Sequence, residues 1–172
     1  MLDHVRKAIR DIPDFPQPGI IFKDITPVLK EPALFDEVVK LFAERVKALR
    51  VDKIAVIESR GFIFGAPVAH ELGLGLVPVR KKGKLPYHTI EESYALEYGT
   101  ATLEVHEDAF EKGERIVIID DLLATGGTAL ASAKLVERLG AHVAEFLFLV
   151  ELGFLDGRKK LSGYEVFAPV VY

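Results

Sequence analysis

The chain has 172 residues, of which 49% are hydrophobic and 28% are charged, so it can bury a full core as one globular domain, residues 1–172. Cysteine is absent, which excludes disulfides, zinc–thiolate sites and cysteine nucleophiles, and the net charge of -4 argues against general nucleic-acid binding. The N-terminus has no signal-peptide pattern, and no run approaches the roughly 18 apolar residues of a membrane span. We therefore expect a cytoplasmic protein with no membrane partner.

The side chains that are missing also carry information. Asn is absent, Gln occurs only as Gln17 and Met only at position 1, whereas Lys and Glu are plentiful. Depletion of thermolabile residues together with Lys and Glu enrichment is typical of thermophiles. The composition therefore predicts a thermophilic source.

The first elements that the sequence predicts lie before residue 50. Residues 3–11 can form a short helix, and the proline-rich segment 14–19 predicts a turn. The apolar residues 20–22 predict a strand packed against the main core. Pro32 suits the first position of a helix, and apolar residues at helical spacing extend this helix to Leu49.

A second strand and loop follow at residues 54–62. Residues 54–57 are apolar and predict a buried strand, which runs into the loop 58–62 and then a helix that stops at Gly73. A strand-to-helix loop that carries Arg60 and glycine can bind an anion. An exposed, solvated arginine would explain the pattern equally well.

Cations gather in the next segment. Residues 76–79 predict a strand, although Pro78 favours a position at a sheet edge or a strand end. Four cations follow within residues 80–84, either as a solvated run or as an anion site at the end of the strand. The polar residues 85–93 predict a mobile loop, and the alternation in 100–105 predicts a hairpin strand.

The most informative stretch begins with the four β-branched residues 116–119, which predict a strand buried on both faces. Asp120 and Asp121 follow, then the small-residue loop 124–128, then a helix that ends before Gly140. A strand, a glycine loop and a helix N-terminus together predict a phosphate site. The two carboxylates would repel phosphate, so they suit sugar hydroxyls or a divalent cation. The nucleotide motifs GxxxxGK[ST] and GxGxxG are both absent.

The alternation of strands and helices predicts the fold class. A further parallel strand is expected at 143–150 and a final one at 164–170. The pattern predicts an α/β fold with a doubly wound, mostly parallel sheet and helices on both faces. The candidate sites at 58–61, 80–84 and 120–128 all follow strands, so they meet at one edge of this sheet.

Five segments resemble, in the same order, motifs of the type I phosphoribosyltransferases, and of their adenine-specific members in particular. The segment VIIDDLLATGGT is similar to the motif that binds phosphoribosyl pyrophosphate (PRPP), and the others are DFPQPGIIFKDITPVLK, ESRGFIFGAP, RKKGKLP and SYALEYG. The resemblance implies the type I phosphoribosyltransferase fold, with a small N-terminal hood over the base (1–30) and a flexible flap or hairpin (81–105). It also implies transfer of phosphoribose from PRPP to adenine, giving AMP and pyrophosphate.

The resemblance further assigns a role to individual residues. It implies catalytic roles for Glu97, Arg60 and Lys84, with Glu97 at N7 of the purine. The resemblance implies that the PRPP 5′-phosphate and ribose bind Asp120, Asp121, Ala124, Thr125, Gly126, Gly127 and Thr128. It implies that pyrophosphate binds Ser59, Arg60, Gly61, Arg80, Lys81 and Lys84. Adenine is implied to bind Ile21, Phe22 and Lys23.

Cofactor and partners are implied in the same way. The resemblance implies Mg²⁺ held mainly by PRPP, without a dedicated protein site, and a homodimer in which Arg80 reaches the neighbouring site. Many members carry Arg where this chain has Lys23, a change of little consequence if the backbone makes the contact. Two alternatives stay open: an enzyme for hypoxanthine, guanine or xanthine, and a non-catalytic regulator that senses PRPP or purines.

Overall fold

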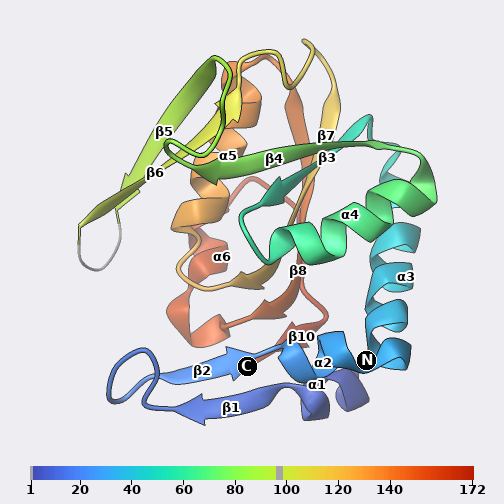
Figure 1. Ribbon diagram of the computed structural model, residues 1–172, viewed down its shortest axis with the longest axis vertical. Helices are drawn as coiled ribbons and strands as arrows, with labels where there is room; N and C mark the ends of the chain where they lie inside the picture. Colours follow the sequence, from blue (N-terminus) through green and yellow to red (C-terminus); the bar gives the residue numbers. More distant parts are fainter. Residues whose placement is uncertain (1, 96–98) are drawn as a thin grey trace.

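A computed structural model describes residues 2–95 and 99–172 of the chain. Its centre is an eight-stranded sheet, and a separate two-stranded sheet lies near the N-terminus (Figure 1). The helices are α1 (Asp3–Ala8), α2 (Thr26–Lys30), α3 (Pro32–Leu49), α4 (Gly61–Leu72), α5 (Gly127–Arg138), the 3-10 turn η1 (Gly153–Leu155) and α6 (Gly157–Lys160). The strands are β1 (Arg10–Pro13), β2 (Ile21–Asp24), β3 (Lys53–Ile57), β4 (Gly75–Lys81), β5 (Thr89–Ala95), β6 (Thr100–His106), β7 (Arg115–Leu123), β8 (His142–Glu151), β9 (Val166–Phe167) and β10 (Val170–Val171).

The large sheet is mostly parallel. Its order is β10-β8-β7-β3-β4-β6-β5, and β9 also pairs with β8. The pairs from β10 to β4 are parallel, whereas β6 pairs antiparallel with both β4 and β5. The predicted doubly wound, mostly parallel α/β fold is confirmed.

Helices cover both faces of the sheet, as the continuous apolar strands require. Alternate residues of β3 send Ile54 and Val56 toward α3 and α4, and Ala55 and Ile57 toward α5. Strand β7 divides in the same way, so each face has its own buried cluster. Burial of strands on both faces is the reason that residues 116–119 show no polar alternation.

Several predicted elements match the structure closely. The long helix begins at Pro32 and ends at Leu49, as predicted. Gly73 and Gly140 follow α4 and α5 with φ of 65° and 85°, in the left-handed region where glycine is favoured. The helix predicted for residues 3–11 is shorter, because β1 already begins at Arg10.

Pro78 lies in the middle of the sheet order, yet it obeys the rule for proline in strands. Residues 75–79 of β4 pair with β3, whereas only Arg80 and Lys81 pair with β6. Pro78 is paired with β3 but not with β6, so its missing N–H interrupts no hydrogen bond between β4 and β6. The prediction of a sheet edge is wrong for β4, which lies between β3 and β6, although Pro78 itself has no partner on β6.

The prediction of a loop over residues 85–93 is wrong in its second half, because β5 begins at Thr89. Strand β5 turns Glu92 toward α5, where a purely apolar pattern would place a hydrophobic residue. Lys134 and Arg138 of α5 pair with this carboxylate. Glu92 can be polar at this inward position because Lys134 and Arg138 of α5 pair with it. A polar residue at an inward position breaks the apolar alternation by which a strand is predicted.

Two other boundaries differ from the prediction. The final strand expected at 164–170 is divided into β9 and β10. Asp120 and Asp121 do not follow β7 but belong to it, since β7 continues to Leu123 alongside β8. Within the described residues, no helix is long and apolar enough to cross a membrane.

Candidate active site

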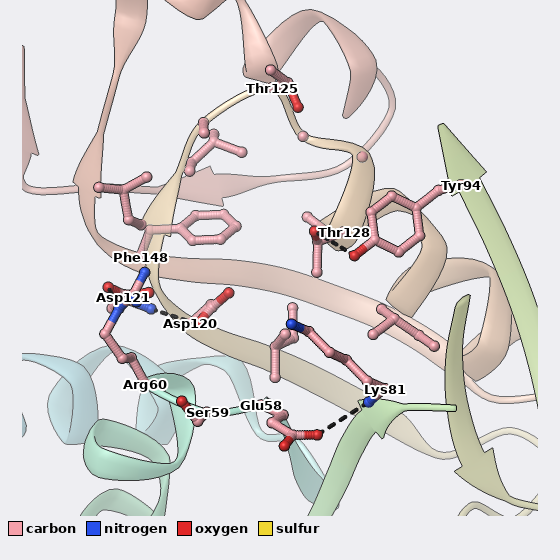
Figure 2. A pocket seen from close by; sticks show the side chains of 18 residues that line it. Glu58, Ser59, Arg60, Lys81, Tyr94, Asp120, Asp121, Thr125, Thr128 and Phe148 are labelled. Carbon is pink, nitrogen blue, oxygen red and sulfur yellow. Dashed lines mark hydrogen bonds and ion pairs between the residues drawn. The ribbon is translucent and has the colours of Figure 1, made fainter. Parts of the chain in front are cut away.

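A pocket of about 430 Å³ opens where β3 and β7 end. Three of its walls come from the segments that the sequence singled out, and a fourth comes from the β5–β6 hairpin (Figure 2). Carboxyl ends of parallel strands meet at one edge of a sheet, so the strand order explains why distant segments share one pocket. Its lining comprises residues 57–60, Lys81, Tyr94, Leu103, residues 120–129 and Phe148.

The glycine loop forms one wall. Gly126 has φ of 78°, and a Cβ atom there would lie 2.6 Å from the carbonyl oxygen of Gly157. Helix α5 begins directly afterwards, at Gly127. The positive end of its dipole and the amides of its first turn therefore face the pocket, which is the environment that a phosphate group prefers.

Tyr94 was not predicted as a site residue, yet it lies against this loop. The Thr128 hydroxyl donates a hydrogen bond to the Tyr94 hydroxyl oxygen at 3.2 Å. A Cβ on Gly127 would approach the Tyr94 ring to 3.1 Å. The hairpin thus contacts the glycine loop through one aromatic side chain, a contact between residues more than 30 positions apart that no local pattern reveals.

The acidic pair occupies the floor of the pocket, and its two members differ. Asp121 is 3% exposed and forms an ion pair with Arg60. Asp120 accepts a hydrogen bond from the amide of Asp121 at 2.9 Å. Burial raises the pKa of Asp120 well above its usual range, and the negative charge of Asp121 raises it further.

Arg60 connects the acidic pair with the N-terminal segment. Its guanidinium carbon lies 5.9 Å from the centre of the Phe22 ring, and its side chain is about half-exposed. Gly61 allows this arrangement, because a Cβ there would lie 2.6 Å from the carbonyl oxygen of Ile119. The loop that carries Ser59 and Arg60 can approach β7 only if residue 61 has no side chain.

The predicted cations divide between pocket and framework. Lys81 lines the pocket, and Figure 2 shows its side chain reaching in between Asp120 and Thr128. Arg80 instead pairs with Glu58 at 3.0 Å and donates to the carbonyl oxygen of Lys84 at 3.1 Å. Neither Arg80 nor Lys84 belongs to the pocket lining.

The predicted base-binding residues lie on β2, beside the pocket rather than in its lining. Phe22 packs edge-on against Phe15, with ring centres 5.3 Å apart. Lys23 pairs with Asp11 at 2.6 Å. Phe22 is linked to the pocket through Arg60, whose guanidinium group lies near its ring. Glu97, the predicted catalytic carboxylate, lies outside the described residues.

The acidic side chains of the pocket decide whether the protein itself can hold a metal ion. In the described ranges 2–95 and 99–172, no group of three or more His, Asp or Glu side chains could hold a metal ion. Three carboxylates line the pocket: Asp120, Asp121 and Glu58, the last of which is paired with Arg80. Carboxylate oxygens are hard ligands of the kind that Mg²⁺ prefers, and Mg²⁺ is commonly held by one or two carboxylates together with substrate phosphates.

With this fold and site, the chain belongs to the phosphoribosyltransferase family, since the model of the phosphoribosyl transferase domain matches residues 24–167. Its relatives point to one branch. The adenine phosphoribosyltransferase of Caldanaerobacter subterraneus subsp. tengcongensis is 56% identical over 171 residues, with 99% of each chain covered. The enzyme of that name from Carboxydothermus hydrogenoformans is 58% identical, covering 98% of this chain and 99% of the relative.

Solved structures agree. The crystal structure of adenine phosphoribosyltransferase from Thermoanaerobacter pseudethanolicus superposes with a TM-score of 0.96 at 55% identity, covering all of both chains. The enzyme of that name from Saccharomyces cerevisiae, solved as a complex with an imino-altritol bisphosphate and adenine, gives a TM-score of 0.92 at 40% identity over 96% of each chain. The likeness therefore includes the N-terminal segment as well as the sheet.

Proposed function

We propose that this protein transfers the 5-phosphoribosyl group of PRPP to adenine, giving AMP and pyrophosphate. The observation that carries the proposal is the convergence of three features on one pocket: a glycine loop at the start of α5, an acidic pair whose second member is buried, and the cations Arg60 and Lys81. A phosphorylated sugar with a pyrophosphate leaving group needs these three features together. Relatives named adenine phosphoribosyltransferase over the full chain support the choice of base.

The reaction forms a bond between N9 of adenine and C1′ of the ribose, while the bond from C1′ to pyrophosphate breaks and the N9 proton leaves. The loop 124–128 holds the 5′-phosphate, and Asp120 and Asp121 face the ribose hydroxyls. Ser59, Gly61 and the cations hold the departing pyrophosphate. Positive charge develops on the ribose as the bond breaks, so the nearby carboxylates stabilise it electrostatically.

The base lies under a hood formed by residues 1–30. Phe22 stacks on the purine, and backbone groups near Ile21 and Lys23 read its edge, which distinguishes an amino purine from an oxo purine. The segment 81–105 acts as a flap, whose closure excludes water from the reacting sugar. Glu97 hydrogen-bonds the purine at N7, and Lys84 completes the charge around pyrophosphate.

Mg²⁺ and a second subunit are part of the proposal. Phosphoribosyltransferases generally use PRPP with Mg²⁺. When bound here, the ion would neutralise charge on pyrophosphate, and Asp120 and Asp121 could contact it, since Glu58 is paired with Arg80. We place the reaction in the cytoplasm and expect a homodimer. For Arg80 to reach a neighbouring site, it would have to leave Glu58 and the carbonyl group of Lys84.

The test is pyrophosphate release with PRPP and Mg²⁺, offering adenine, hypoxanthine, guanine and xanthine in separate reactions. We expect turnover with adenine alone. Turnover with an oxo purine would keep the PRPP site but reject the proposed reading of the base. Tight PRPP binding without turnover on any base would replace the enzyme by a regulator.

A further inference from the structure

The cationic run 80–84 has two kinds of member in the structure. Arg80 pairs with Glu58 and Lys82 pairs with Glu91, so the charge of each is neutralised inside the chain. Among the described residues, no carboxylate forms an ion pair with Lys81 or Lys84. These two lysines therefore keep their charge available for an anion, whereas Arg80 and Lys82 do not.

We infer that Glu58 and Glu104 are positioning residues, which fold the segment 80–85 so that Lys81 and Lys84 face pyrophosphate. Both act through the backbone of this segment, and neither is assigned a direct contact with substrate. The inference rests on the proposed function, because it names the residues that hold the pyrophosphate cations in place.

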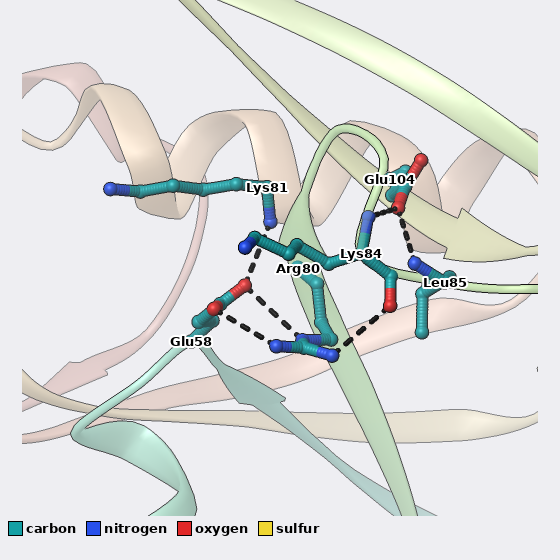
Figure 3. A network of polar contacts seen from close by, with 6 residues as sticks. All are labelled: Glu58, Arg80, Lys81, Lys84, Leu85 and Glu104. Atoms are coloured by element: carbon teal, nitrogen blue, oxygen red, sulfur yellow. Dashed lines mark hydrogen bonds and ion pairs between the residues drawn. The ribbon is translucent and has the colours of Figure 1, made fainter.

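Glu104 holds the turn from the interior of the sheet. It lies on β6, is 3% exposed, and accepts hydrogen bonds at 2.8 Å from the amides of Lys84 and Leu85 through one oxygen, Oε1 (Figure 3). Burial alone would raise the pKa of Glu104, but hydrogen bonds from the amides of Leu85, Gly83 and Lys84 outweigh it and lower the pKa. The carboxylate is therefore ionised at neutral pH, and its charge strengthens these bonds.

Glu58 holds the same segment from the other side. Its carboxylate accepts two bonds from the Arg80 guanidinium, at 3.0 and 3.2 Å, and one from the Lys81 amide at 3.1 Å. Arg80 then donates to the carbonyl oxygen of Lys84, so Glu58, Arg80 and Lys84 form a chain of contacts. Figure 3 shows the Lys81 and Lys84 side chains extending in the same direction from this framework.

The position of Glu58 argues against a purely electrostatic role. Glu58 lines the pocket, where a negative charge opposes the binding of a polyanion such as PRPP. Arg80 neutralises that charge, so the pair contributes geometry and little net field. Charge and positioning therefore predict opposite results when Glu58 is neutralised.

The deciding experiment is calorimetric titration of the full chain with PRPP and Mg²⁺, together with steady-state kinetics. If Glu58 acts by position, Glu58→Gln weakens PRPP binding by about tenfold or more, although it removes a negative charge. Glu104→Ala has the same effect, and Glu104→Gln, whose amide oxygen can still accept, falls between the wild type and Glu104→Ala. The KM for adenine changes little in all three variants.

Two controls separate position from general stability. Glu145→Gln breaks a comparable pair with Arg45 at a carboxylate that is 1% exposed and outside the pocket, so it lowers the thermal midpoint but leaves PRPP affinity unchanged. Lys82→Met removes a cation from the same run and also leaves affinity unchanged, whereas Lys81→Met and Lys84→Met weaken it.

The outcomes are distinct. Unchanged or tighter PRPP binding by Glu58→Gln would overturn the inference, as would equal losses in Glu145→Gln and Glu104→Ala. If Glu104→Ala does not fold, Glu58→Gln and Glu104→Gln decide. Because binding is measured directly, the inference can be tested even if the wild type turns over no base, which would reject only the proposed reaction.

Discussion

Asp120 and Asp121 are neighbours in sequence, yet the structure gives them opposite effects on stability. The raised pKa of Asp120 means that its contribution to stability is present below its unfolded pKa and is lost as pH rises through the folded value. At neutral pH, above the unfolded pKa, Asp120 therefore costs stability. We predict that Asp120→Asn raises the free energy of unfolding by about 1 kcal/mol, or about 2–4 °C in thermal midpoint, and weakens PRPP binding.

Asp121 provides the comparison. It forms an ion pair with Arg60, so Asp121→Asn leaves a partly buried guanidinium without its carboxylate. We expect the free energy of unfolding to fall by about 1 kcal/mol, and the thermal midpoint to fall with it. The loss is modest because Arg60 is about half-exposed and solvent screens its charge. Thermal melts of both variants at neutral pH test the pair. Shifts of the same sign would contradict this division of roles.

The residues that sequence could identify are those whose chemistry lies in a contiguous motif. Asp120, Asp121 and Thr128 follow one another along a strand, loop and helix, and the structure places them in one pocket. Tyr94 and Glu104 were not predicted because their partners lie in other segments. Tyr94 bonds to a hydroxyl group on α5, and Glu104 bonds to two backbone amides after β4. A backbone amide leaves no trace in a side-chain pattern, so no reading of single residues could find that contact.

At the scale of elements, the glycine loop at 124–128 depends on a short helix that comes about 30 residues later. A Cβ on Gly157, the first residue of α6, would lie 2.0 Å from the carbonyl oxygen of Ala124. We predict that Gly157→Ala displaces the loop and weakens PRPP binding by about tenfold or more, since small misplacement of a binding group is costly. Calorimetric titration with PRPP measures the effect.

Gly75→Ala is the matched control for that prediction. At Gly75, on β4, a Cβ would meet only the flexible side chain of Lys53, at 3.3 Å, and that side chain can move. PRPP affinity should then stay at the wild-type value. An equal loss in Gly75→Ala and Gly157→Ala would mean that the effect is a general loss of stability and not a contact with the loop.

Sequence patterns predicted the elements of the core better than those of the hairpin. Strands β3 and β7 are buried on both faces, so continuous apolar runs marked them clearly. Strand β5 was missed at Thr89 because its inward Glu92 is satisfied by Lys134 and Arg138 of α5. That tertiary pairing replaces apolar alternation, and a local pattern cannot anticipate it.

For the whole molecule, these carboxylates predict a stability curve with a maximum in mildly acidic solution. The pKa of Asp120 is raised in the folded protein, so the stability cost of Asp120 shrinks as pH falls toward the unfolded pKa. The pKa values of Glu58 and Glu104 are lowered. Hydrogen bonds from Arg80 lower the pKa of Glu58, and hydrogen bonds from backbone amides lower that of Glu104, in both cases against the effect of burial. Their contributions are present above the unfolded pKa of about 4.3 and are lost as pH falls through the folded values.

Chemical unfolding of the full chain at a series of pH values measures this curve. We expect Asp120→Asn to abolish the rise between neutral and mildly acidic pH, because an amide has no proton to take up. Glu104→Ala should reduce the fall at lower pH, since it removes one of the carboxylates whose protonation drives that fall. A wild-type curve that declines steadily from neutral pH downward would show that Asp120 is ionised without cost in the folded protein.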